Sequence, residues 1–234
     1  MKYVAFDIET AAVAPEGADW RDGRPLGITC AALAWLGPDG NIRTEARHGC
    51  NTDGSPAACL LEDECADIVH GLQKAVAQGY TLLTWNGLGF DFDILAEESG
   101  LHSECAALAL HHVDMMYQVL CITGFPLSLN AAAKGMGLAG KSEGVDGAQA
   151  PLMWAAGRHA EVLEYVQQDV RTTLEVALAV EKRHGLRWIA KSGRTNVLMI
   201  PQWLTVAEAQ LLPLPDTSWM SAPWPRAKFT AWMT

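Results

Sequence analysis

Three short sequence patterns place acidic side chains where they could bind metal ions. Residues 2–9, KYVAFDIE, alternate apolar and other side chains with the period of a strand, so Asp7 and Glu9 point to the same side. Two carboxylates beside an apolar strand repel each other and lose hydration, and a bound divalent cation removes both penalties. An isolated D-x-E is more often the solvated face of an edge strand. The other two patterns must therefore support a metal site.

The second pattern is the segment WNGLGFDFD at positions 85–93. An apolar strand ends there in a glycine-containing turn that delivers Asp91 to the start of a helix, and ligands of α/β sheets gather near such strand ends. A helix N-cap is an almost equally good interpretation of Asp91. Asp93 is a rival ligand, although its position two residues further on favours exposure to solvent or an interaction with the helix dipole.

The third pattern is the pair Tyr165 and Asp169 within a long predicted helix at 158–184. The i, i+4 spacing puts both residues on one helix face. That face is otherwise apolar, and an acid within it requires a partner. For Asp169 alone, a stripe that turns toward solvent at this point is the more frequent case. The predicted stripe consists of Val162, Tyr165, Asp169, Thr173, Val176 and Val180.

Together and in this order, the three patterns resemble the DEDDy group of 3′–5′ exonucleases, which have a ribonuclease H-like fold. The blocks of that group are D-x-E, N-x₃-F-D and Y-x₃-D, and they match Asp7/Glu9, the run from Asn86 to Asp91, and Tyr165/Asp169. The surrounding sequence is similar to stand-alone exonucleases related to the proofreading domain of family B DNA polymerases. The similar segments are 6–10, 85–87, 112–115, 128–138, 140–141 and 165–172, so the resemblance covers residues 2 to about 184.

This resemblance implies a site for two divalent cations, Mg²⁺ or Mn²⁺, which carboxylate oxygens suit. Asp7 would bridge both metal ions, and Glu9 and Asp169 would bind the one that holds the attacking water. Asp91 would support the other ion, mainly through water. Tyr165 would orient the attacking water, because a phenol with a pKa near 10 positions water better than it deprotonates it.

The resemblance also implies a nucleic-acid partner with a free 3′ end, for which we expect single-stranded DNA. Thr10 is similar to a residue that contacts the terminal nucleotide, and Asn86 and Lys141 are candidate substrate contacts. For the last two, a turn-forming Asn and a solvated Lys are the more frequent cases.

The remaining pattern predicts an α/β fold with a mixed sheet flanked by helices. Strands at 2–9, 27–36 and 41–47 form an antiparallel meander, and the chain then alternates strands and helices. Asp114 is expected to cap the helix that follows it. The predicted helices are 61–78, 92–98, 115–122, 128–136 and 158–184, with strands at 80–85 and 108–113 and a glycine-rich loop at 135–147.

We expect an exonuclease domain at 1–184 and an appendage at 185–234 that is rich in tryptophan, proline and basic residues. Gly185 is expected to terminate the long helix, and the appendage is predicted to be an irregular tail packed on the domain. The net charge of −10 divides into +5 for residues 182–234 and −15 for the rest. The basic tail is therefore the best candidate for binding a nucleic-acid strand, while burial is the expected role of most of its tryptophans.

The six cysteines are scattered without a CxxC pair, which indicates neither a zinc site nor a disulfide framework. We expect a cytoplasmic protein without a membrane partner and leave open whether it forms a homo-oligomer. Three other functions compete with the DNA exonuclease. They are an exoribonuclease or oligonucleotidase with the same site, a non-catalytic nucleic-acid-binding domain of the same fold, and a metal-dependent phosphatase for small molecules.

Overall fold

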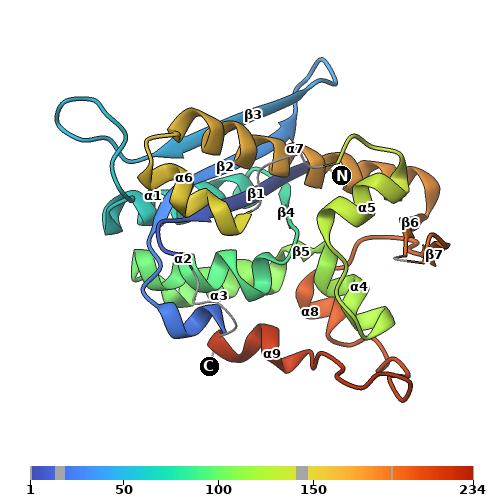
Figure 1. Cartoon of the computed structure of the whole chain (residues 1–234). Helices are drawn as coiled ribbons and strands as arrows, with labels where there is room; N and C mark the ends of the chain where they lie inside the picture. The colour runs from blue at the N-terminus through green and yellow to red at the C-terminus, as the bar shows by residue number, and fades with distance from the viewer. Residues whose placement is uncertain (1, 14–18, 141–146, 191, 234) are drawn as a thin grey trace.

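A computed structural model describes residues 2–13, 19–140, 147–190 and 192–233. A sheet in the order β3-β2-β1-β4-β5 lies at its centre (Figure 1). β1 and β2 pair antiparallel, as do β2 and β3, whereas β4 is parallel to both β1 and β5. The predicted mixed sheet is thus confirmed. Its strands are β1 (Lys2–Thr10), β2 (Ile28–Leu36), β3 (Ile42–His48), β4 (Tyr80–Thr84) and β5 (Val113–Asp114).

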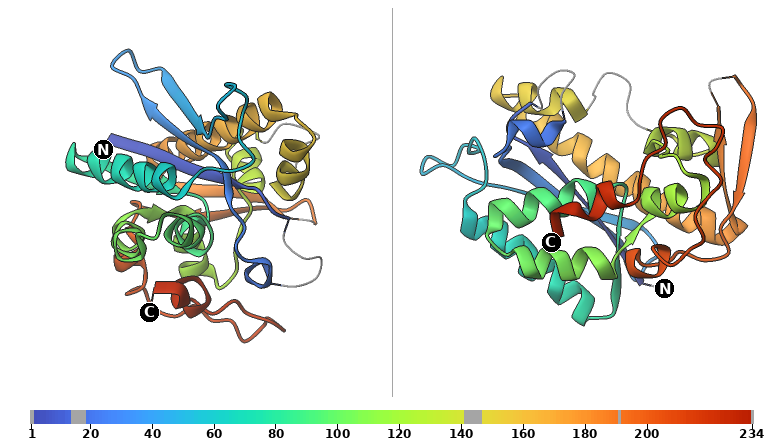
Figure 2. Two further views of the ribbon diagram at one scale, coloured as in Figure 1. Left: turned by 90° about the vertical axis from the view of Figure 1, so that its left-hand side faces the viewer. Right: turned by 90° about the horizontal axis from the view of Figure 1, so that it is seen from below.

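Helices cover both faces of this sheet and enclose two apolar cores (Figures 1 and 2). α7 (His159–Arg183) crosses one face, where it contacts β1, β2 and β3, and α5 (Leu129–Met136) and α6 (Ala150–Ala155) pack beside it. The other face is covered by α1, α2 and α3, and α4 lies at the end of the sheet between the two cores. These four helices are α1 (Glu62–Ala77), α2 (Asp91–Ser99), α3 (His102–His111) and α4 (Met115–Thr123). No helix in the described part of the chain is long and apolar enough to cross a membrane.

The alternation of β1 decides which face of the sheet receives its acids. Phe6 and Ile8 point into the core under α1 to α3, whereas Tyr3 and Ala5 point into the core under α7. Asp7 and Glu9 continue the series of Tyr3 and Ala5, because side chains two residues apart share a face. Both acids therefore point toward α7.

The strand predicted at 108–113 is largely wrong. Its first four residues belong to α3, in which Cys105, Leu108 and Ala109 are buried at helical spacing, and only Val113 and Asp114 form β5. A short apolar run does not distinguish a buried strand from a buried helix face. The predicted loop at 135–147 begins within the last turn of α5, and its residues 141–146 lie outside the described structure.

The tail is more regular than predicted. It forms a hairpin of β6 (Gly185–Ile189) and β7 (Thr195–Met199), followed by α8 (Val206–Ala209) and α9 (Ala227–Thr230). His184, with φ 52°, occupies the left-handed position expected for Gly185, and Gly185 itself begins β6. Trp203 and Phe229 are buried in the two cores. The division at residue 184 stays a prediction.

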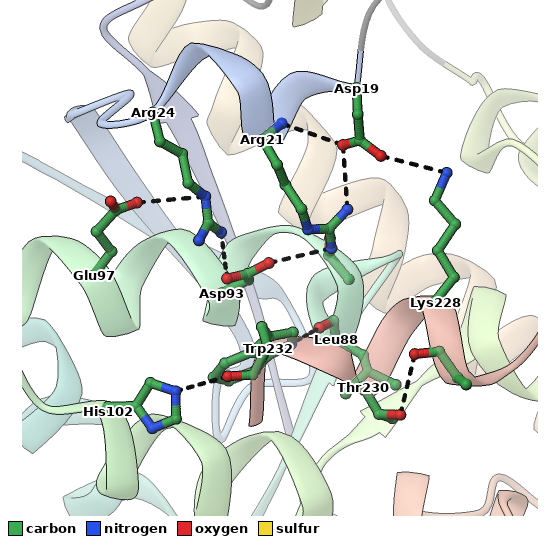
Figure 3. A network of polar contacts seen from close by, with 12 residues as sticks. Asp19, Arg21, Arg24, Leu88, Asp93, Glu97, His102, Lys228, Thr230 and Trp232 are labelled. Atoms are coloured by element: carbon green, nitrogen blue, oxygen red, sulfur yellow. Dashed lines mark hydrogen bonds and ion pairs between the residues drawn. The ribbon is translucent and has the colours of Figure 1, made fainter. Parts of the chain in front are cut away.

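The end of the tail lies beside α2 (Figure 3). Trp232 donates its indole N–H to the Leu88 carbonyl oxygen at 2.7 Å, and Lys228 pairs with Asp19 at 3.7 Å. The Phe229 ring packs against Gly89 so closely that a Cβ there would lie 2.7 Å from Cδ1 of the ring. The last residues of the tail therefore support the turn that precedes α2.

Two helical glycines have opposite surroundings and provide a matched test of how the hairpin is attached. A Cβ on Gly135 in α5 would lie 2.1 Å from the Arg187 carbonyl oxygen of β6, whereas no atom lies within 4 Å of a Cβ on Gly71 in α1. We expect Gly135→Ala to lower the free energy of unfolding by about 1–3 kcal/mol, because α5 and β6 must separate. Gly71→Ala should raise it by roughly 0.5–1 kcal/mol. Urea unfolding of both variants measures the difference, and equal effects would contradict the tight contact.

Candidate active site

Three carboxylates from two elements meet beneath α7. One oxygen each from Asp7, Glu9 and Asp169 lie within 4.8 Å of one another. Asp7 and Glu9 come from the α7 side of β1, and Asp169 comes from the middle of the helix stripe and is 5% exposed. The whole predicted stripe is buried, so the alternative in which it turns toward solvent at Asp169 is wrong.

Asp91 reaches the same cluster from the other side of the sheet. It is the first residue of α2, and Phe90 occupies the N-cap position, so an N-cap role for Asp91 is wrong. Its Oδ1 accepts a hydrogen bond from the Ile8 backbone N–H at 3.0 Å, and its charge is, besides burial, one of the causes that raise the pKa of Asp7. The start of α2 is thus fixed to β1 next to Asp7.

Asp93, the rival ligand, points elsewhere. Its carboxylate is 3% exposed and pairs with Arg21 at 3.2 Å and with Arg24, both from the segment that precedes β2 (Figure 3). The predicted exposure to solvent is therefore wrong. The two arginines compensate the charge of this buried acid, and their ion pairs anchor the segment before β2 to α2.

The carboxylate cluster has an electrostatic cost. Burial, followed by the charges of Asp91, Asp169 and Glu9, raises the pKa of Asp7 well above its ordinary value. Burial also raises the pKa of Asp91 to about 6. Like charges in a buried site favour protonation unless a cation compensates them. The donor set, which consists of carboxylate oxygens, fits hard divalent cations such as Mg²⁺ or Mn²⁺.

A pocket of about 420 Å³ opens over the cluster. Asp7 and Asp169 contribute its carboxylates, and Asn86 lies in its wall. None of the other wall residues was predicted to be a site residue, because apolar and hydroxyl side chains carry no catalytic signature. These are Trp85, Met116, Pro126, Leu127, Ser128, Leu129 and Thr173.

The turn that carries Asn86 is held by a buried acid, Asp114. Asn86 has φ 78°, which agrees with a turn-forming role. Asp114 Oδ1 accepts backbone N–H bonds from Asn86 at 3.0 Å and from Tyr117 at 2.9 Å, and Oδ2 accepts from Leu88 at 2.9 Å. The predicted cap of α4 is confirmed. The contact with the turn was missed, because it joins residues 26 and 28 positions apart.

The remaining predicted residues have different surroundings. Tyr165 is 4% exposed and lies one helical turn before Asp169, and its hydroxyl would be 3.6 Å from a Cβ on Gly147. Thr10 is buried, and its hydroxyl donates to the Ala12 carbonyl oxygen at 3.1 Å. Lys141 lies outside the described residues.

The raised pKa of Asp7 makes the stability of metal-free protein depend on pH. Its folded pKa exceeds the unfolded value near 4, so the folded protein retains a proton that the unfolded chain loses as pH rises. Stability therefore decreases above about pH 4. At pH 8 in EDTA, Asp7→Asn should melt a few degrees higher than the unmodified protein, because it removes one charge that the neighbouring carboxylates repel. A gain of about 1–2 kcal/mol in the free energy of unfolding corresponds to a shift of that size.

With divalent cations, the unmodified protein should instead melt at a higher temperature than Asp7→Asn. Saturating Mg²⁺ or Mn²⁺, at about 100 times the dissociation constant, stabilises a binding protein by roughly 2.7 kcal/mol, and Asp7→Asn should lose most of that gain. Thermal unfolding at pH 8 and pH 5, with and without metal, measures both effects. A metal-induced shift that Asp7→Asn leaves intact would place the metal ions elsewhere.

The match of a protein-family model supports the fold. The family model of the RNase H superfamily matches residues 60–180, just over half of the chain. No curated protein matches. A structure of E. coli Exonuclease I with a dT13 oligonucleotide is similar at 15% identity and a TM-score of 0.41, over 78% of this chain and 41% of that one. A structure of the ExoI/SSB-Ct complex is similar at 15% identity and a TM-score of 0.38, with the same coverage. This chain thus spans less than half of those chains. On the match of the family model, the protein belongs to the RNase H superfamily.

Proposed function

We propose that this protein is a metal-dependent 3′–5′ exonuclease that hydrolyses phosphodiester bonds at the 3′ end of single-stranded DNA. The observation that carries the proposal is the convergence of Asp7, Glu9 and Asp169 within 4.8 Å, with Asp91 bonded to the Ile8 backbone N–H next to Asp7. Membership of the RNase H superfamily and the three sequence blocks shared with DEDDy exonucleases support it.

The four carboxylates would hold two divalent cations, Mg²⁺ or Mn²⁺. When bound, such ions lower the pKa of an attacking water and stabilise the leaving 3′ oxygen. Besides burial, the charges of all three other acids raise the pKa of Asp7, which suits a residue shared by both ions. Tyr165 lies on the same helix face as Asp169 and would orient the attacking water through its hydroxyl.

The pocket above the cluster suits a terminal nucleotide. Its volume of about 420 Å³ falls within the range of small-molecule sites. Asn86 would contact the nucleotide from the wall, and Lys141 and Thr10 stay candidate contacts. Thr10 would have to exchange its bond to the Ala12 carbonyl oxygen for one to the substrate. An exoribonuclease or oligonucleotidase would use the same site, because the choice of sugar depends on a contact to the 2′-hydroxyl.

Three further proposals concern the cellular compartment, the catalytic role and the domain organisation of the protein. All six cysteines are free thiols, which agrees with a reducing cytoplasm. A non-catalytic nucleic-acid-binding domain is less favoured than an enzyme, because the four carboxylates and the tyrosine of the family pattern are all present. Residues 185–234 would form an appendage to the exonuclease domain.

A nuclease assay tests the proposal directly. Purified protein is incubated with 3′-labelled and 5′-labelled DNA and RNA, single- and double-stranded, with Mg²⁺, Mn²⁺ or EDTA. We expect stepwise shortening from the 3′ end that requires metal and is fastest on single-stranded DNA. Asp7→Asn should reduce the rate by more than roughly 100-fold, because even outer-shell changes at metal sites cost 10–100-fold. Asp67→Asn, the same change at an exposed position of α1, is the matched control. Activity that persists in EDTA or in Asp7→Asn would contradict the mechanism.

Substitution of Asn86 by glycine separates its two roles. Glycine adopts a positive φ without strain, so Asn86→Gly keeps the turn and removes only the side-chain amide. If the amide contacts the terminal nucleotide, KM should rise about tenfold while the melting temperature stays constant. Asn86→Ala should in addition destabilise the protein by roughly 1–2 kcal/mol. Unchanged kinetics of Asn86→Gly would show that Asn86 only forms the turn.

A further inference from the structure

Three aromatic side chains from separate segments meet, and one of them is adjacent in sequence to residues that line the pocket. The Phe125 ring lies 6.2 Å from the Trp188 ring of β6 and 6.2 Å from the Trp219 ring, edge-on to both. Phe125 immediately precedes residues 126–129, which line the pocket. We call Phe125, Trp188 and Trp219 the aromatic shelf.

Trp219 is the most exposed member of the shelf. Its side chain is 68% exposed, although the segment that carries it packs on Gly124 at the end of α4 (Figure 2). Its indole N–H donates to the Asp216 carbonyl oxygen at 3.1 Å, while the Asp216 carboxylate accepts from the Ser218 backbone N–H. The indole is thus held by its polar edge, which leaves most of its surface accessible to a ligand.

The basic residues of the tail whose positions the structure describes divide into two groups. Arg226 donates to four backbone carbonyl oxygens, and Lys228 pairs with Asp19, so both serve the packing of the tail. Arg187 and Arg194 are exposed on the β6–β7 hairpin and form no ion pair with any residue that the structure describes. The cations that remain accessible thus lie on the hairpin that also carries Trp188.

The hairpin lies about one helix length from the pocket. Leu129, at the start of α5, lines the pocket, and the other end of α5 contacts β6, where the Arg187 backbone N–H lies 3.3 Å from Met136 Sδ. Eight helical residues span about 12 Å, which corresponds to roughly four stacked nucleotides at about 3.4 Å each.

We propose that the aromatic shelf binds unpaired nucleobases of a single strand whose 3′ end occupies the pocket, with Arg194 at the turn of the hairpin contacting its phosphates. This inference rests on the proposed function and specifies its substrate as single-stranded. Exposed aromatic rings combined with cations are the features by which proteins bind single strands without sequence preference. Bases of a duplex are stacked on one another and cannot offer their faces to an indole.

Binding is measured on Asp7→Asn protein with Mg²⁺, so that cleavage does not interfere. The probes are fluorescein-labelled single-stranded dT12 and a 12-base-pair duplex, followed by fluorescence anisotropy. Trp219→Ala on this background should weaken dT12 binding about tenfold, within the range for loss of one base-stacking partner, and Trp219→Phe should restore most of it. Trp224→Ala is the matched control, because Trp224 is also exposed (46%) but contacts Lys228 and Phe229 instead of the shelf.

A second measurement distinguishes the shelf from the catalytic site. With Asp7 intact, hydrolysis of thymidine 5′-(4-nitrophenyl) phosphate, whose single nucleobase would occupy the pocket and leave none for the shelf, should be equal in Trp219→Ala and the unmodified protein. Unchanged dT12 binding by Trp219→Ala, an equal loss in Trp224→Ala, or equal affinity for the duplex would overturn the shelf. Absence of all hydrolysis by the unmodified protein would instead count against the proposed exonuclease, since the binding measurement does not need turnover.

Discussion

The repulsion among buried carboxylates at the centre of the sheet is the constraint on which the rest of the structure depends. Asp7 is enclosed by three other acids, and its pKa is raised by burial and by their charges. Such a cluster lowers stability in the absence of a compensating cation. The fold nevertheless holds the acids in place, because each is fixed by a backbone element whose own packing is apolar. The alternation of side chains along β1 directs Asp7 toward α7, and the buried stripe of α7 directs Asp169 toward the sheet.

The parts of the site that could be predicted from sequence are those that local geometry determines. Asp7 and Glu9 share a strand face because side chains alternate, and Tyr165 and Asp169 share a helix face because four residues make about one turn. Each relation spans at most four residues. It therefore remains the same whichever elements pack against the strand or the helix.

The errors concern relations between distant segments. Asp91 and Asp93 both lie in the first turn of α2, but they have different partners. Asp91 contacts the backbone of β1, whereas Asp93 pairs with the arginines of residues 19–24. No local pattern contains that information. Asp114 shows the same limit, since its role as a cap is local and its contact with the turn at 86–88 depends on the pairing of β4 with β5.

The tail shows why composition alone is a weak guide to a binding surface. Its excess of basic residues suggested a surface for phosphates, yet the contacts of Arg226 with the Cys121 carbonyl oxygen of α4 and of Lys228 with the Asp19 carboxylate attach the tail to the rest of the protein. Its tryptophans divide in the same way, with Trp203 in a core and Trp219 at the surface. A side chain that attaches the tail would have to give up its contacts to bind nucleic acid, and that exchange would cost stability. A single strand of nucleic acid is therefore better bound by side chains that the packing of the tail leaves exposed, such as Trp219 and Arg194.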